Sequence, residues 1–410
     1  MTDERGMAIV GAGHVGGRAA QTLREAGWQG RITLIGAEPH MPYERPPLSK
    51  DLLTARREAE HCRLRPREAW VEDGIEHVVA TVQAIDPREQ VLRLDDGRTI
   101  AYEALLLATG GDARRLSIPG ANSAGVHCLR TLDDALGIRQ RLTPGARVVV
   151  IGGGFIGLEV AASARMCECD VTVVEGASRL MGRAVPEPIA ARAHALHERK
   201  GVRLLLGAAP LAIETGENAS LVVRLESGDA LYADTVVVGI GIEPADGLAR
   251  AAGLDVERGI VVGQTLETSA RNVYAAGDVA VFPSRFGTHR IRQETWHNAE
   301  TQSQLAARNM LGAREAYRAL PWFWSDQFDY QLQVAGEPGL GRQSVVRSIA
   351  DDAEIHFHLD SGGRLVGASG LGPAGAFVRE MKLARMLVDR EAVIGQAELA
   401  DLGVKLKRFL

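Results

Sequence analysis

The first forty residues alternate between short apolar runs and a stretch with helical periodicity. The run Met7–Val10 predicts a buried strand, residues 18–26 predict a helix that ends at Gly27, and residues 31–36 predict a second strand. A glycine-rich stretch joins the first strand to the helix. The pattern therefore predicts a strand–helix–strand unit at the start of the sequence.

The same pattern returns further along the chain. Residues 147–151 predict a strand, residues 158–166 a helix and residues 170–174 another strand, again with glycines between the first two elements. Two such units in one chain indicate two domains of related fold.

Two later apolar strands end in glycine motifs, at 105–110 and 235–241, and the pattern changes from about Tyr317 onward. There, alternating β-like runs are followed by a helical tail. The predicted fold class is therefore α/β, with two doubly wound dinucleotide-binding (Rossmann-like) domains plus a C-terminal α+β domain.

The first glycine stretch fits a dinucleotide-binding loop. Gly11, Gly13 and Gly16 give the G-x-G-x-x-G spacing between a strand and a helix, which brings a pyrophosphate to the helix N-terminus. Glu38, just after the second strand, is placed to accept hydrogen bonds from ribose hydroxyls. The alternatives are a glycine-rich turn of some other α/β protein and, for Glu38, an ordinary surface acid.

The second stretch repeats the spacing with Gly152, Gly154 and Gly157. Glu175 ends the following strand, where a carboxylate pairs with the 2′-hydroxyl of NAD and repels the 2′-phosphate of NADP. We therefore expect NADH to be preferred over NADPH, although Arg179 and Arg183 lie downstream and could weaken that preference.

Composition and charge narrow the classes of function. The chain has 410 residues, 46 of them glycine, and a formal net charge of −5. Nucleic-acid-binding proteins are usually strongly basic, so this net negative charge does not favour nucleic-acid binding. The sequence shows no apolar run long enough for a membrane helix and no signal-peptide pattern at its start, so a cytoplasmic protein is expected.

The cysteines indicate no redox or metal motif. Cys62, Cys128, Cys167 and Cys169 form neither a C-x-x-C pair nor a zinc-ligand spacing. Idle thiols in a reducing compartment are the expected interpretation.

Several longer motifs resemble the FAD-dependent pyridine nucleotide-disulfide oxidoreductase superfamily. Within it, the likeness is greatest to the ferredoxin reductases of cytochrome P450 and aromatic-ring dioxygenase systems. Besides the glycine loops, it rests on Tyr43–Lys50, Ala108–Gly110, Leu129–Asp133, Gly277–Asp278 and Pro321–Gln327.

The resemblance implies roles for residues outside the glycine loops. Lys50 would lie near flavin N5, where a cation stabilises negative charge on reduced flavin, and Asp278 would bind the ribityl chain. The alternative for Lys50 is a solvated lysine at a helix start. The alternative for Arg130 is a surface ion pair with Asp133 or Asp134. The residues that would lie along FAD are His14, Arg45, Lys50, Thr109, Gly110, Arg130, Asp278 and Trp296.

The resemblance also implies a nicotinamide site. Glu159 would face the nicotinamide, which makes Lys50 and Glu159 the two candidate catalytic residues, and an ordinary helix carboxylate is the alternative for Glu159. The other residues implied near NADH are Phe155, Ile156, Arg183, Gly239 and Gly241.

A discontinuous FAD domain follows from the position implied for Asp278, far downstream of the second loop. The expected domains are 1–110 with 238–315 for FAD, 111–237 for NAD and 316–410 at the C-terminus. In the region where glutathione-reductase-like relatives carry a cysteine pair, this chain has 45–50 without cysteine, so no disulfide chemistry is expected.

The predicted activity is transfer of a hydride from NADH to FAD and then of single electrons to a [2Fe–2S] ferredoxin that serves a P450 or aromatic-ring dioxygenase. The protein would be a monomer or homodimer, and Arg63, Arg65 and Arg67 are candidates for a basic docking patch. One alternative is a flavin reductase for a quinone, monodehydroascorbate or dioxygen. Another is an NADH-sensing interaction protein resembling apoptosis-inducing factor.

Overall fold

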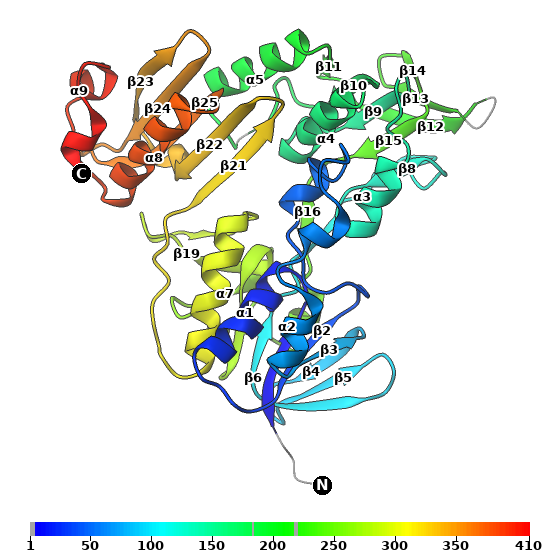
Figure 1. Cartoon of the computed structure of the whole chain (residues 1–410), viewed down its shortest axis with the longest axis vertical. Coiled ribbons are helices and arrows are strands. Elements are labelled where there is room, and N and C mark those ends of the chain that lie inside the picture. Colours follow the sequence, from blue (N-terminus) through cyan, green and yellow to red (C-terminus); the bar gives the residue numbers. More distant parts are fainter. Residues whose placement is uncertain (1–4, 183, 217–219) are drawn as a thin grey trace. The chain divides into compact units, whose positions relative to one another are not determined.

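The computed structural model describes residues 5–182, 184–216 and 220–410 (Figure 1). The described chain divides into two compact units, each built from three separate segments. The first unit contains Met1–Arg45, Ala59–Asp112 and Ile242–Ala319; the second contains Pro46–Glu58, Ala113–Gly241 and Leu320–Leu410.

A parallel sheet forms the centre of the first unit. Its parallel strands run in the order β3-β2-β1-β6-β18, and an antiparallel pair, β5 and β4, extends from the start of β6. The strands are β1 Gly6–Val10, β2 Ile32–Gly36, β3 Ile75–Val79, β4 Val82–Asp86, β5 Val91–Leu94, β6 Thr99–Leu107 and β18 Val273–Ala275. Every residue of β1 and β2 is buried, as expected for parallel strands covered on both faces.

Two long helices lie side by side on this sheet, α1 (His14–Glu25) and α7 (Trp296–Met310) (Figure 1). The prediction that the first helix starts at residue 18 is wrong, because α1 begins directly after the loop at His14. Glycine is a poor helix former, so Gly16 and Gly17 hid the first turn in the sequence. The short helices and small strands of this unit are α2 Arg67–Glu72, α6 Gly247–Ala251, β17 Ile260–Val261, β19 Ala280–Pro283 and β20 Arg290–Ile291.

The second unit contains a five-stranded parallel sheet in the order β11-β10-β9-β15-β8. Its strands are β8 Val126–Cys128, β9 Arg147–Ile151, β10 Asp170–Glu175, β11 Arg203–Leu206 and β15 Thr235–Val238. Its helices are α3 Leu132–Arg139, α4 Phe155–Met166 and α5 Glu187–Arg199. The prediction of a helix start at residue 158 is wrong for the same reason as above, since α4 begins at Phe155.

An antiparallel meander packs on this sheet; it consists of β12 Pro210–Thr215, β13 Leu221–Leu225 and β14 Ala230–Ala233. The sequence pattern did not predict it. Two short strands, β7 Gly111–Ala113 and β16 Ile242–Pro244, lie near the points where the chain passes between the units.

The end of the chain forms an antiparallel five-stranded sheet in the order β21-β22-β25-β24-β23, which confirms an α+β region at the C-terminus. One face packs on α8 (Ala376–Asp389), and the other packs on α4 and α5 through Leu158, Ile189 and Leu332. The strands are β21 Trp322–Gln327, β22 Tyr330–Gly336, β23 Gln343–Ala350, β24 Ala353–Leu359 and β25 Leu365–Pro373.

A buried arginine fastens the last residues to the edge of that sheet. Arg347 on β23 is 1% exposed, pairs with Glu380 at 3.2 Å, and donates to the carbonyl oxygens of Leu399, Asp401 and Val404. Helix α9 (Gln396–Ala400) consequently packs along β23, the outermost strand.

Candidate functional site

The first glycine loop is shaped by two steric requirements and leaves one opening. Gly11 has φ +112°, and a methyl group there would overlap the carbonyl oxygen of Ala108. A methyl group at Gly16 would overlap the carbonyl oxygen of Gly11. At Gly13 the nearest atom to an added methyl is Arg45 Nη2 at 4.0 Å, so this position faces open space.

The opening at Gly13 fits a dinucleotide. Gly13 is the N-cap of α1 and has no side chain to occupy the free N–H groups of the first turn. A pyrophosphate suits these N–H groups and the positive end of the helix dipole, and the Arg45 guanidinium beside the opening adds positive charge.

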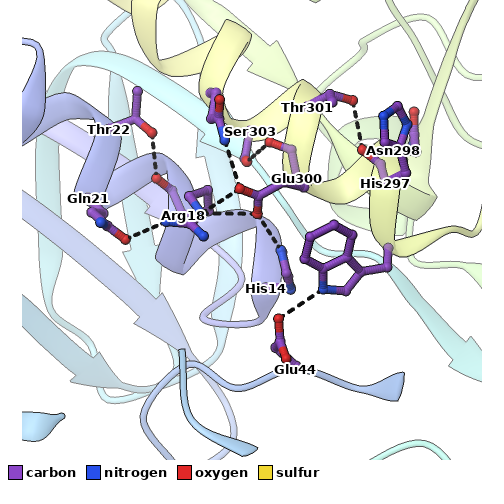
Figure 2. A network of polar contacts seen from close by, with 12 residues as sticks. His14, Arg18, Gln21, Thr22, Glu44, His297, Asn298, Glu300, Thr301 and Ser303 are labelled. Atoms are coloured by element: carbon purple, nitrogen blue, oxygen red, sulfur yellow. Dashed lines mark hydrogen bonds and ion pairs between the residues drawn. The ribbon is translucent and has the colours of Figure 1, made fainter. Parts of the chain in front are cut away.

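A polar network ties the start of α1 to α7 (Figure 2). His14 Nε2 lies 2.9 Å from Glu300 Oε2, and Arg18 Nε lies 2.9 Å from Glu300 Oε1. Burial alone would raise the pKa of Glu300, but the hydrogen bonds from His14 and Arg18 bring that pKa below its usual value. The network holds the loop-bearing turn of α1 in place.

Trp296 joins this network through its ring. It packs edge-on against His14 with ring centroids 5.4 Å apart, and its indole Nε1 donates to Glu44 Oε1 at 3.0 Å. Trp296 is also the first residue of α7, which is capped by Thr295.

Glu38 is engaged by neighbours from its own unit. Tyr43 donates its hydroxyl to Glu38 Oε2 at 2.6 Å, and Arg45 Nη2 lies 3.1 Å from Oε1. The carboxylate is 31% exposed, so it still reaches solvent and a ribose could approach it. Ribose binding by Glu38 stays a prediction.

The remaining FAD candidates lie at strand ends or turns. Thr109 donates its hydroxyl to the Ala245 carbonyl at 2.7 Å, and Gly110 turns the chain with φ +63°. Asp278 is half-buried in the short 3₁₀ turn Gly277–Val279. Arg130 precedes the capping box of α3, and its backbone N–H bonds the Asp134 carboxylate at 3.0 Å.

The second glycine loop repeats the construction of the first. Gly152 has φ +113°, and methyl groups at Gly152 and Gly157 would overlap the carbonyl oxygens of Gly239 and Gly152. An added methyl at Gly154 would meet no described atom within 4 Å. Gly154 is the N-cap of α4, so this loop too presents free N–H groups to open space.

A cavity of about 420 Å³ opens above this loop. Phe155, Glu175, Gly239 and Gly241 line it together with the glycine loop. Ile156 does not line the cavity and is 45% exposed, while Arg183 lies outside the described residues.

Backbone groups hold Glu175 at the cavity wall. Its Oε2 accepts from Gly153 N at 2.6 Å and its Oε1 from Ala177 N at 2.7 Å. Arg179 donates to the Val185 carbonyl at 3.0 Å and is thereby engaged elsewhere. These two hydrogen bonds fix the orientation of the carboxylate at the cavity wall, where it is suited to recognise a ribose 2′-substituent.

The two candidate catalytic residues meet in one partly buried cluster. Lys50 Nζ lies 2.9 Å from Asp326 Oδ2 and 3.5 Å from Glu159 Oε1. Burial lowers the pKa of Lys50, but the two carboxylates outweigh burial, so the net shift is upward. Burial raises the pKa of Glu159, against the opposing influence of Lys50 and two hydroxyl donors.

Those two hydroxyls belong to residues that sequence reasoning missed. Ser49 Oγ donates to Glu159 Oε2 at 2.5 Å, and Ser325 Oγ donates to Oε1 at 2.6 Å. Asp326, which binds Lys50, was missed as well. All three lie inside quoted motifs, 43–50 and 321–327, which was the only available signal for them.

The structure also describes the suggested basic patch and the four cysteines. Arg65 of the suggested basic patch is bound to Asp73 at 2.5 Å, which leaves Arg63 and Arg67 as its exposed members. All four cysteines are free thiols, and burial raises the pKa of Cys169 to about 11. In the described part of the chain we find no helix with the length and apolar character needed to span a bilayer.

Comparison with known proteins covers nearly the whole chain. Residues 6–303 match the family model "Pyridine nucleotide-disulphide oxidoreductase", and residues 322–410 match "Reductase C-terminal". The ferredoxin–NAD(+) reductase component of an anthranilate 1,2-dioxygenase system from Burkholderia cepacia is 42% identical over 98% of both chains. Rhodocoxin reductase from Rhodococcus erythropolis is 38% identical over 98% of this chain and 93% of its own.

Solved structures agree with this. The putidaredoxin reductase chain in its covalent complex with putidaredoxin superposes with a TM-score of 0.93 at 34% identity, over 99% of this chain and 98% of that chain. The ferredoxin reductase of the CYP199A2 system from Rhodopseudomonas palustris gives 0.92 at 37% identity, over 98% of both chains. The chain therefore belongs to the pyridine nucleotide-disulphide oxidoreductase family.

Proposed function

We propose that the protein is an NADH-dependent ferredoxin reductase that uses FAD. It takes a hydride from NADH and delivers single electrons to a [2Fe–2S] ferredoxin that serves a P450 or aromatic-ring dioxygenase. The carrying observation is that one chain holds two glycine loops of the same construction, each with an open second glycine at a helix N-terminus. The relatives' shared activity as ferredoxin–NAD reductases supports the choice of acceptor.

The first loop is proposed to hold FAD. Gly13 and the first turn of α1 bind the pyrophosphate, with Arg45 beside it and Glu38 toward the ribose. When bound, FAD supplies the conversion of a two-electron donor into single electrons. The other residues proposed along FAD are Gly11, His14, Gly16, Thr109, Gly110, Arg130, Asp278 and Trp296.

The second loop and its cavity are proposed to hold NADH. Glu175 recognises the ribose hydroxyls, and Gly154 with the first turn of α4 binds the pyrophosphate. Phe155, Ile156, Arg183, Gly239 and Gly241 are the other candidates.

Lys50 and Glu159 are proposed to act at the nicotinamide–flavin site. Lys50 supplies a positive charge where negative charge grows during reduction, and Glu159 keeps that ammonium oriented. Since Lys50 carries a raised pKa, it stays protonated throughout the physiological range.

The domain division and surroundings remain part of the proposal. We assign 1–110 with 238–315 to FAD, 111–237 to NAD and 316–410 to the C-terminal domain, and note that Pro46–Glu58 groups with the NAD-side segments. Four free thiols and an NADH requirement support a cytoplasmic location. A monomer or homodimer remains the expected oligomeric state.

Anaerobic stopped-flow mixing tests this function. The flavin of the holoenzyme should bleach rapidly with NADH, and a [2Fe–2S] ferredoxin added next should be reduced rapidly. Bleaching without transfer would favour a quinone, monodehydroascorbate or dioxygen acceptor or an NADH-sensing role. No bleaching would contradict the NADH assignment itself.

A further inference from the structure

A row of buried polar side chains leads away from Glu159 within the second unit. Ser325 Oγ lies 2.6 Å from Glu159 Oε1, Gln327 Nε2 lies 3.3 Å from Ser325 Oγ, and His197 Nε2 lies 3.1 Å from Gln327 Oε1. Ser325 is 1% exposed, and Gln327 and His197 are fully buried. The residues come from α4, β21 and α5, so the row crosses from the NAD-side helices to the C-terminal sheet.

The chemistry of each group fixes the direction of the hydrogen bonds. Ser325 has a single hydroxyl proton and donates it to Glu159 Oε1. Ser325 must then accept from the Gln327 amide nitrogen, which leaves the Gln327 carbonyl to accept from His197. His197 therefore carries its proton on Nε2, and every donor in the row faces toward the carboxylate.

His197 is suited to the end of such a row. Burial lowers its pKa to about 4, so the ring is neutral and has one proton to place. Its Nδ1 is buried and has no hydrogen-bond partner among the described atoms, as expected for the bare nitrogen of the Nε2–H tautomer.

Aligned donors oppose the upward shift that burial gives the pKa of Glu159. Each hydrogen bond polarises the next, so the row stabilises a negative charge more than Ser325 would alone. Other groups also influence this charge. Those facing Glu159 are Lys50 and Asp326, and those near the far end of the row are His194, Lys200 and Asp329.

We propose that Ser325, Gln327 and His197 are positioning residues that hold Glu159 ionised and so keep Lys50 protonated and in place. The proposal rests on the function proposed above only for its consequence in catalysis. The ionisation of Glu159 itself requires neither NADH nor ferredoxin.

Infrared spectroscopy of the oxidised holoenzyme tests this directly. The carboxylic C=O band of protonated Glu159, identified by its loss in Glu159→Gln, would be titrated over about pH 5 to 9. We expect Gln327→Leu and Ser325→Ala to raise the titration midpoint by about one pH unit, a tenfold change in the protonation equilibrium. Ser325→Thr and His197→Gln, which keep a donor, should restore most of the wild-type midpoint.

Ser163→Ala is the matched control, because Ser163 on α4 also loses a buried hydroxyl but donates to the Ser49 carbonyl rather than to Glu159. Its midpoint should equal the wild-type value. The pH profile of flavin reduction by NADH should shift with the infrared midpoint in each variant. If Gln327→Leu melts like wild type yet keeps the wild-type midpoint, the proposal is wrong; if it does not fold, the contrast of Ser325→Ala with Ser325→Thr decides.

Discussion

The two glycine loops are built alike but are secured differently. Both require their first and third glycines for packing and leave the second open. The residue after the second glycine differs: His14 in α1 is buried and bound to Glu300 on another helix, whereas Phe155 in α4 lines a cavity. One loop is locked by a polar network and the other adjoins an accessible cavity.

Their acidic residues differ in the same sense. Glu38 is bound by two side chains, Tyr43 and Arg45, whereas Glu175 is held by two backbone N–H groups. A backbone-held carboxylate is fixed before any ligand arrives. The difference indicates that a similar loop can serve either a resident cofactor or one that enters and leaves in each cycle.

The largest expected loss of stability comes from adding a side chain at the third glycine of either loop, where no space exists for one. Gly16→Val and Gly157→Val each force a side chain into a backbone carbonyl, and we expect either to lower the free energy of unfolding by at least about 3 kcal/mol. Denaturant unfolding measures this. The matched variants Gly13→Ala and Gly154→Ala should fold normally; a similar loss of stability there would contradict the open space at these positions.

Replacing each acidic residue by alanine should show that only the second loop determines nucleotide preference. Glu175→Ala should raise KM for NADH about 10-fold, equivalent to about 1.4 kcal/mol of lost binding, and narrow the gap to NADPH. Steady-state kinetics with both nucleotides measures it. Glu38→Ala serves as the control and should leave the NADH/NADPH ratio unchanged, so an equal effect there would remove the assigned difference.

Removing the residue after the second glycine should affect stability at one loop and nucleotide binding at the other. His14→Ala leaves Glu300 short of a donor in a partly buried site, and we expect a loss of about 1–3 kcal/mol in the free energy of unfolding. Phe155→Ala should mainly weaken NADH binding. Thermal melting and flavin release are measured together for both variants. A larger loss of stability in Phe155→Ala than in His14→Ala would argue against a locked first loop.

The smallest effect is a pH dependence confined to the first loop. Because Glu300 has a lowered pKa in the folded protein, its network contributes stability above the ordinary glutamate pKa and loses it as pH falls through the lowered value. We therefore expect Glu300→Gln to flatten the stability profile below about pH 4.5. Melting temperatures of both proteins from neutral to acidic pH check this, and parallel curves would count against it.

The glycine loops could be located from the sequence because their signal is local. Three glycines at fixed spacing between a strand and a helix predict both the tight turn and the surface that faces the ligand. The helix starts were misjudged because glycine propensity contradicts the helical first turn that the tertiary fold imposes at Gly16 and Gly17.

The polar clusters could not be found in that way. His14 meets Glu300 across 286 positions, and Ser49 meets Glu159 across 110. No local pattern records such pairings, because they depend on how separate segments pack. Resemblance indicated Lys50 and Glu159, but only the folded chain shows that the two share one cluster with Asp326 and a pair of serines.

The buried Arg347 depends on hydrogen-bond acceptors that are synthesised about fifty residues after it. While the ribosome is still making residues 399–404, the guanidinium that will be buried has none of the three carbonyl acceptors that the finished chain supplies. The outermost strand β23 is also uncovered at that stage, with a free edge able to pair with another nascent chain. Because residues 399–404 supply these acceptors and α9 packs along β23, we expect removal of this segment to reduce first the yield of folded protein rather than the rate of its chemistry.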